Sequence, residues 1–175
     1  MTGGAQLETA RLRLRPAAYE DRDELVALEQ DPEVMRFLSG DFLKPRGGEP
    51  GVWTAREKST GAFVGWLGLY DRGDGTGDLG YRLARAIWGA GYASEGAGRL
   101  VDFGFTELGL ARIVADTMAV NLASRRVMER AGLVHRRTTH PVYADPKPGA
   151  EHGDVEYEIT RESWLRGNLS VIVSA

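Results

Sequence analysis

The sequence of 175 residues contains no cysteine. This absence excludes disulfides, thiolate zinc sites, iron–sulfur clusters and a thiol nucleophile at once. Long hydrophobic runs are missing too: the apolar stretches last only a few residues, far short of the roughly 18 that a transmembrane helix needs. Residues Met1 to Pro16 hold no apolar segment of the kind found in secretory signals, so we expect a cytoplasmic protein with no membrane partner.

A strong excess of charge of one sign is also absent. Lysine and arginine number 22 and aspartate and glutamate 25, which leaves a net charge of −3. A balance this close to neutral argues against a dedicated nucleic-acid coat and a polybasic membrane binder. Hydrophobic residues make up 42% of the chain. That share is ordinary for a globular protein, and the length predicts a single domain over residues 1–175.

Hydrophobic periodicity and turn residues predict a mixed α/β fold with an antiparallel start and one strand–helix–strand crossover. The predicted strands cover residues 11–15, 52–57, 63–70, 78–83, 112–120, 133–139 and 154–160. The predicted helices cover residues 20–30, 34–38, 122–131 and a long stretch that begins at a glycine-bearing turn, 88–94, and ends near residue 108. Loops rich in proline and glycine fill residues 39–51 and 140–153.

The segment Gly75-Thr76-Gly77-Asp78-Leu79-Gly80 matches the dinucleotide-binding pattern G-x-G-x-x-G. It runs into a predicted strand rather than opening a helix, and this context favours a hairpin turn. An oxidoreductase function would depend on this segment alone. The three histidines, His135, His140 and His152, lack the spacing of metal ligands, so we expect no metal site.

A second glycine-bearing segment, residues 88–94, lies between a predicted strand and a predicted helix. The first turn of a helix has unpaired N–H groups and the positive end of the helix dipole. Gly89 and Gly91 let this backbone approach an anion closely, and the small side chains of Ala90, Ala93 and Ser94 leave it accessible. The segment suits a cradle for a phosphate or diphosphate, and an ordinary glycine turn that starts a helix fits it equally well.

Asn121 and Ser124 stand where the next predicted strand passes into a helix. Asn121 can form a hydrogen bond with an amide-bearing ligand that lies along the strand end. Ser124 can cap the helix or donate a proton, and capping is the common role of serine at this place.

Together these segments resemble the GNAT superfamily of acetyl-CoA-dependent N-acetyltransferases, and within it the RimJ/RimL-like subgroup, over nearly the whole chain. The segments that carry the resemblance are 7–16 as the opening strand, 78–83 as the fourth strand, 88–95 as the diphosphate loop and 121–133 as the Asn-x-x-Ser helix with the strand entry that follows it. Two positions depart from the pattern: Trp88 stands where Gln or Arg is common, and Leu133 where the subgroup often has Phe.

The resemblance implies a mostly antiparallel, twisted sheet of six or seven strands, with helices on both faces and a splay between the fourth and fifth strands. Acetyl-CoA would be the co-substrate, and its pantetheine arm would enter the splay. The cofactor-binding residues that the resemblance implies are Leu83, Arg85, Trp88, Gly89, Ala90, Gly91, Tyr92, Ala93, Ser94, Asn121 and Ser124.

The resemblance further implies that a neutral amine attacks the thioester directly in a ternary complex, so no protein nucleophile is required. Ser124 would protonate the leaving thiolate. Asp78 is the first candidate for the base that takes a proton from the ammonium, and Asp116 and Glu158 are its rivals.

The acceptor implied by the resemblance is a primary amine, on a protein N-terminus or on a small molecule. We expect the loops 37–51 and 140–153 to select it, with Trp53, Trp66 and Tyr143 as substrate-binding residues. The chain would act as a monomer or a homodimer. A catalytically inactive module that binds or senses acyl-CoA remains the alternative.

Overall fold

The computed structural model describes residues 4–38 and 51–173, with an eight-stranded sheet of order β1-β2-β3-β4-β5-β6-β8-β7. Most of the predicted acceptor loop 37–51 lies outside the described residues. The strands are β1 (Leu7–Glu8), β2 (Leu12–Pro16), β3 (Val52–Glu57), β4 (Phe63–Asp71), β5 (Thr76–Leu83), β6 (Arg112–Met118), β7 (Val134–Thr139) and β8 (Asp154–Thr160). The helices are α1 (Arg22–Gln30), α2 (Tyr92–Thr106), α3 (Leu122–Arg130) and α4 (Arg161–Val173), with short 3-10 turns at Tyr19–Asp21, Arg85–Ile87 and Ala150–His152.

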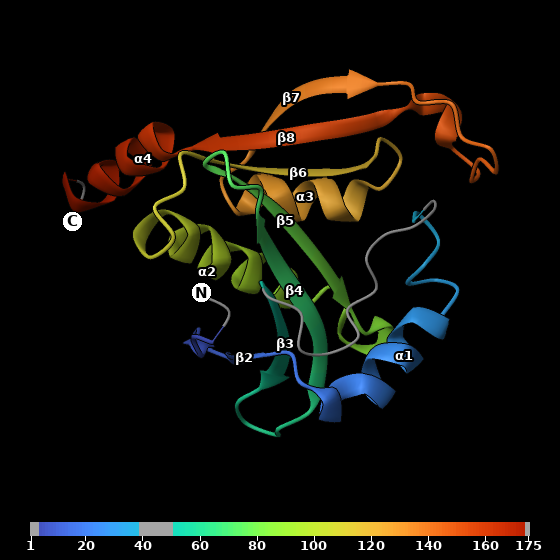
Figure 1. Ribbon diagram of the computed structural model, residues 1–175, viewed down its shortest axis with the longest axis horizontal. Helices are drawn as coiled ribbons and strands as arrows, with labels where there is room; N and C mark the ends of the chain where they lie inside the picture. Colours follow the sequence, from blue (N-terminus) through green and yellow to red (C-terminus); the bar gives the residue numbers. More distant parts are fainter. Residues whose placement is uncertain (1–3, 39–50, 174–175) are drawn as a thin grey trace.

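Helices cover both faces of the sheet, as predicted (Figure 1). Helices α2 and α3 pack on one face, where Leu67, Leu100 and Phe105 belong to a large apolar core. Helix α1 packs on the other face, where Leu25 and Leu28 form a smaller cluster with residues of β3 and β4. The central strands are therefore buried from both sides, which fixes their position.

The predicted splay between the fourth and fifth strands of the sequence is present between β5 and β6. These two strands are parallel and pair only from Thr76 opposite Arg112 to Asp78 opposite Val114. Beyond these residues β5 turns away toward α1, whereas β6 continues beside β8 (Figure 1). The result is an opening in the sheet whose walls are the ends of two strands.

The register of β5 shows which backbone groups face this opening. Antiparallel neighbours alternate between residues whose N–H and C=O groups face each other and residues whose groups face outward. The N–H of Ala84 donates to the carbonyl of Val64 at 2.9 Å, and the N–H of Arg72 donates to that of Thr76 at 2.9 Å. Even-numbered residues of β5 therefore face β4, and the backbone groups of Tyr81 and Leu83 face the opening.

Two local predictions need correction, and one helix was missed. The sheet has eight strands rather than six or seven, because the two residues of β1 pair with Arg13 and Leu14 of β2. Residues 34–38 do not form a helix: the N–H of Met35 bonds four residues back to Asp31, whereas the N–H groups of Arg36 and Leu38 bond only three residues back. Helix α4 was not predicted, although Thr160 and Ser163 cap its start reciprocally, each hydroxyl accepting the other's N–H at 3.2 Å. No helix within the described ranges is both long and apolar enough to cross a membrane.

Candidate active site

The connection from β5 to α2 is the segment that the sequence predicts as a diphosphate cradle. Gly89 and Gly91 have φ angles of 79° and 85°, a left-handed conformation that residues with a Cβ rarely adopt, and Gly91 is the N-cap of α2. Among the described residues, the N–H groups of Gly89, Gly91 and Tyr92 to Ser94 donate to no other group. A row of amide donors is thus left available at the positive end of a helix of 15 residues.

Trp88 ties this connection to the opening in the sheet. Its indole Nε1 donates to the carbonyl of Leu83 at 2.8 Å, while its ring stays half exposed. The Leu83 carbonyl, which faces the opening, is therefore already engaged. The N–H of Leu83 is the backbone group that is left for a ligand. Arg85 lies beyond the strand in the 3-10 turn, where its carbonyl accepts from the N–H of Trp88 and its guanidinium approaches Asp31 at 3.4 Å.

The opposite wall of the opening carries Asn121 and Ser124 at the start of α3. Asn121 is the N-cap: its Oδ1 accepts from the N–H of Ser124 at 3.2 Å and its Nδ2 donates to Oγ1 of Thr117 at 3.0 Å. The capping role thus belongs to Asn121, and the Ser124 hydroxyl is not needed for it. The Asn121 side chain thus uses its oxygen and one of its two N–H donors within the fold.

Tyr81 joins the two walls and was missed from the sequence. Its hydroxyl lies 2.9 Å from Oγ of Ser124 and donates to the Ser124 carbonyl at 3.0 Å. A phenol has one proton, so when it goes to the carbonyl, the Ser124 hydroxyl donates to the Tyr81 oxygen. Burial raises the pKa of Tyr81, and the hydrogen bond with Ser124 only partly offsets this rise. The phenol therefore stays neutral and fixes the Ser124 hydroxyl.

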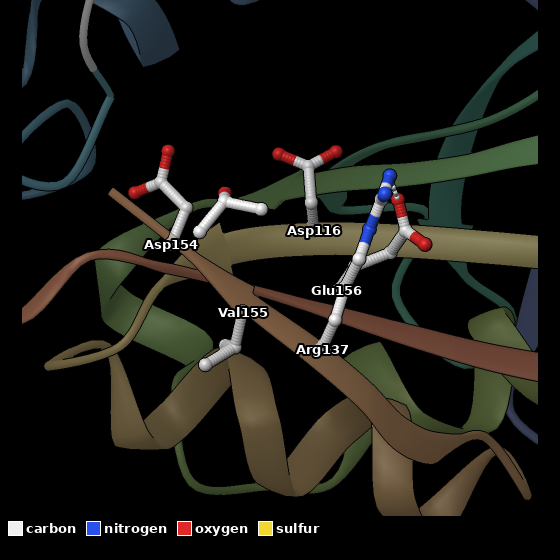
Figure 2. Close-up of a pocket in the computed structure, with 6 residues that line it drawn as sticks. Asp116, Arg137, Asp154, Val155 and Glu156 are labelled. Carbon is white, nitrogen blue, oxygen red and sulfur yellow. Dashed lines mark hydrogen bonds and ion pairs between the residues drawn. The ribbon is translucent and has the colours of Figure 1, made fainter. Parts of the chain in front are cut away.

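A hollow of about 150 Å³ is lined by residues of β6, β7 and β8 (Figure 2). Asp116 and Asp154 point to one side of the sheet, whereas Val155 points to the other (Figure 2). Arg137 and Glu156 complete most of the lining and form an ion pair at 2.9 Å. The hollow is therefore acidic, with one arginine at its side.

Asp116 is the carboxylate of this hollow whose pKa is raised. Lost hydration raises the pKa of Asp116, and the negative charges of Asp78, Asp154 and Glu156 raise it further. Part of its surface is exposed, and Asp116 forms no ion pair with any residue in the described ranges. A carboxylate in this setting accepts a proton more readily than an ordinary aspartate.

The other two candidate bases are engaged with arginines. Both oxygens of Asp78 accept from the guanidinium of Arg72, one of them at 2.5 Å. Glu158 lies 3.5 Å from Arg112 and 3.8 Å from Arg136. Neither carboxylate is as available to an incoming ammonium as Asp116, so the order of the candidates changes: Asp116 comes before Asp78.

Two of the three predicted substrate-binding aromatics are core residues. Trp53 is 1% exposed, donates from its indole to the carbonyl of Ala5 at 2.8 Å and meets Phe103 edge to face. Trp66 is 3% exposed in the cluster beneath α1, with the Arg82 guanidinium 5.4 Å from its ring centre. Neither ring reaches solvent, so the prediction was wrong for both.

Tyr143 is better placed for the predicted role. Its hydroxyl donates to Oδ2 of Asp154, so the loop 140–153 reaches the acidic hollow. In the described part of the chain, no group of three or more histidine, aspartate or glutamate side chains is arranged to hold a metal ion.

Comparison with known proteins gives a consistent result. A family model described as "Acetyltransferase (GNAT) domain" matches residues 11–134. The "FsC-acetyl coenzyme A-N(2)-transacetylase" of Aspergillus fumigatus is 39% identical over 186 residues, covering 91% of this chain and 78% of that protein. The "Uncharacterized N-acetyltransferase p20" of Bacillus licheniformis is 31% identical over 150 residues, covering 73% of this chain and 84% of its own.

Solved structures share the fold. An acetyltransferase of the GNAT family from Bacillus anthracis superposes with a TM-score of 0.79 at 23% identity, covering 90% of this chain and 99% of that one. A spermidine N-acetyltransferase from Vibrio cholerae, in complex with CoA and spermine, gives a TM-score of 0.73 at 15% identity, covering 89% and 99%.

Proposed function

Because the chain belongs to the GNAT family and is an acetyl-CoA-dependent N-acetyltransferase, we propose that it acetylates a primary amine by direct attack on the thioester in a ternary complex. The acceptor amine is carried by a protein N-terminus or by a small molecule, and we place the chain in the RimJ/RimL-like subgroup as one domain over residues 1–175. The observation that carries this proposal is the set of available amides at Gly89 and at Gly91 to Ser94, beside an open strand edge.

The binding of acetyl-CoA follows from these two features. The diphosphate suits the amides of Gly89 and of Gly91 to Ser94, because they combine unpaired donors with the positive end of α2. The pantetheine arm carries amide groups, and the backbone of Tyr81 and Leu83 faces the opening as the edge of a strand would. Because the Trp88 indole already donates to the Leu83 carbonyl, the arm pairs with the remaining backbone groups of this strand edge.

The chemistry then needs three proton-handling steps around the carbonyl carbon. Asp116 takes a proton from the acceptor ammonium, directly or through water, and the neutral amine forms the new C–N bond. The C–S bond then breaks, and the Ser124 hydroxyl gives its proton to the leaving thiolate. The acceptor nitrogen still carries one proton more than the product amide needs, and this proton returns to Ser124 through solvent. Tyr81, 2.9 Å from Ser124 Oγ, holds this hydroxyl in place.

The acceptor side of the proposal follows from charge. Asp116, Asp154 and Glu156 lie on one face of the sheet. The Tyr143 hydroxyl donates to Asp154, the first residue of β8. An ammonium is attracted to such a face before it is deprotonated. We therefore place the acceptor in the acidic hollow, in contact with Asp116.

A binding and turnover screen tests the proposal. Acetyl-CoA should raise the melting temperature and NAD should not, because the G-x-G-x-x-G segment lies in the turn and strand of β5 rather than at a helix start. A panel of N-terminal peptides, polyamines, amino acids and aminoglycosides, followed by release of free thiol, identifies the acceptor. Stabilisation by NAD alone contradicts the proposal. CoA binding without thiol release against any acceptor leaves the non-catalytic binding module instead.

A further inference from the structure

The N-terminal strand segment is bonded directly to the cofactor loop. Arg11, at the turn between β1 and β2, donates from Nη1 to the carbonyl of Ala90 at 2.8 Å and from Nε to Oε2 of Glu95 at 2.6 Å. Its backbone N–H donates to the other oxygen of Glu95 at 2.8 Å. One arginine therefore holds both the loop and the first turn of α2.

The same segment is itself anchored to the sheet. Thr9 donates its hydroxyl to Glu95, and its carbonyl accepts from Nζ of Lys58 at 2.6 Å. The N–H of Lys58 donates to the Arg11 carbonyl at 2.8 Å. The Arg11 guanidinium also lies 4.3 Å from the ring centre of Tyr92, the first residue of α2. Arg11 and Glu95 thus belong to a hydrogen-bond network that reaches Lys58 just after the end of β3, rather than forming a single surface ion pair.

Glu95 is charged under ordinary conditions. Burial opposes the charged form, but the Thr9 hydroxyl and the N–H and guanidinium of Arg11 outweigh it, so the pKa of Glu95 lies below its usual range. The pair with Arg11 is therefore complete at neutral pH.

We propose, on the basis of the function proposed above, that Arg11 and Glu95 are positioning residues that set the affinity for the cofactor diphosphate by holding the loop at residues 89–91 in its binding conformation. Glycines have a wide choice of backbone conformations when they are not held, and ordering them on binding costs free energy. Neither Gly89 nor Gly91 has a side chain that could order the loop from within. The Ala90 carbonyl between them is held by Arg11, so the ordering is done before the cofactor arrives.

The residue type matters for this role. The planar guanidinium reaches a carboxylate and a carbonyl at the same time from separate nitrogens. A lysine ammonium is a single point and cannot span both acceptors in this geometry. Arg13, two residues further along in β2, pairs with Glu8 at 3.2 Å and its side chain is 57% exposed, so it offers a control of the same residue type close by.

The test compares Arg11→Met and Arg11→Lys with Arg13→Met, using the full chain and CoA as the probe. Calorimetry should give a dissociation constant for CoA that is about tenfold weaker in both Arg11 variants, because one charge-assisted contact to the loop is lost. Arg13→Met should bind CoA within twofold of the unmodified protein. With the best acceptor from the panel, the KM for acetyl-CoA should rise in the Arg11 variants while kcat stays within twofold.

A second variant keeps the inference testable if an Arg11 variant does not fold. Glu95→Gln keeps the size of the side chain and breaks only the charge pair, and it should weaken CoA binding about as much as Arg11→Lys. The double variant Arg11→Lys/Glu95→Gln should bind CoA no more weakly than either single variant, because both substitutions remove the same contact. Equal CoA affinity in the Arg11 and Arg13 variants would overturn the inference and leave the proposed function intact. Failure of the unmodified protein to bind CoA would overturn the proposed function itself.

Discussion

Reversing the electrostatics of the cradle gives the sharpest prediction. Gly91→Glu places a carboxylate at the N-cap of α2, beside the amides that are available for the diphosphate. Two unit charges about 5 Å apart repel each other by about 3 kcal/mol at an effective dielectric constant of about 20. That energy corresponds to a loss of roughly a hundredfold or more in affinity for CoA.

The same substitution also strains the backbone, and the two effects are separable. Gly91 has a φ of 85°, where a residue with a Cβ costs about 1–2 kcal/mol. This strain is present with and without ligand, so it lowers the free energy of unfolding but not the affinity. The added Cβ itself meets only Nη2 of Arg11, at an ordinary contact distance of 3.4 Å.

Two matched variants isolate the charge. Gly91→Lys has similar bulk and the same strain but the opposite charge, and it should bind CoA at least tenfold more tightly than Gly91→Glu. Gly73→Glu has the same strain at a φ of 81°, with no atom within 4 Å of its Cβ, and should bind CoA like the unmodified protein. Calorimetric titration with CoA measures all three. Equal affinities for Gly91→Glu and Gly91→Lys, or unchanged binding by Gly91→Glu, would refute the cradle.

Three further predictions concern the opening, the acidic hollow and the cluster under α1. Ser124→Ala should lower kcat by about tenfold to a hundredfold and change CoA affinity less than twofold, since a proton donor acts only in the transition state; steady-state kinetics that keep full speed would remove Ser124 from the chemistry. Asp116→Asn should lower turnover and yet raise the unfolding midpoint at pH 7. The raised pKa of Asp116 means that its charged form costs stability as the pH rises above the ordinary aspartate range, so a thermal scan in which the gain does not shrink toward acid pH would contradict this. Glu29→Gln should cost about 2–3 kcal/mol of unfolding free energy in urea titrations, because it weakens a pair with Arg82 whose side chains are only 11% and 3% exposed. Glu33→Gln, in a pair exposed by about half or more on each side, is the control, and an equal cost in both would be the contrary result.

Local physical chemistry made part of this site predictable. The cradle depends on glycines next to a helix start, and the sequence places Gly89 and Gly91 there without reference to any distant contact. The N-cap of α3 is equally local, because Asn121 lies three residues from the N–H that it accepts. The strand alternation also indicated which stretches form the sheet.

Contacts between distant residues were not predictable in the same way. Tyr81 and Ser124 are separated by 43 residues, and Arg82 and Glu29 by 53, so no pattern in the sequence pairs them. Trp53 and Trp66 were expected at the acceptor site because a strand does not reveal whether helices cover both of its faces. Here α1 and α2 do so, and both rings are buried.

A crystal structure of the complex with CoA is the most direct test of the central claim, that the amides at the start of α2 hold the diphosphate and the splayed strands admit the arm. The account predicts diphosphate oxygens within hydrogen-bonding distance of the N–H groups of Gly89 and of Gly91 to Ser94, and the pantetheine arm alongside Tyr81 and Leu83. A diphosphate bound elsewhere, or an arm outside the opening between β5 and β6, would contradict it.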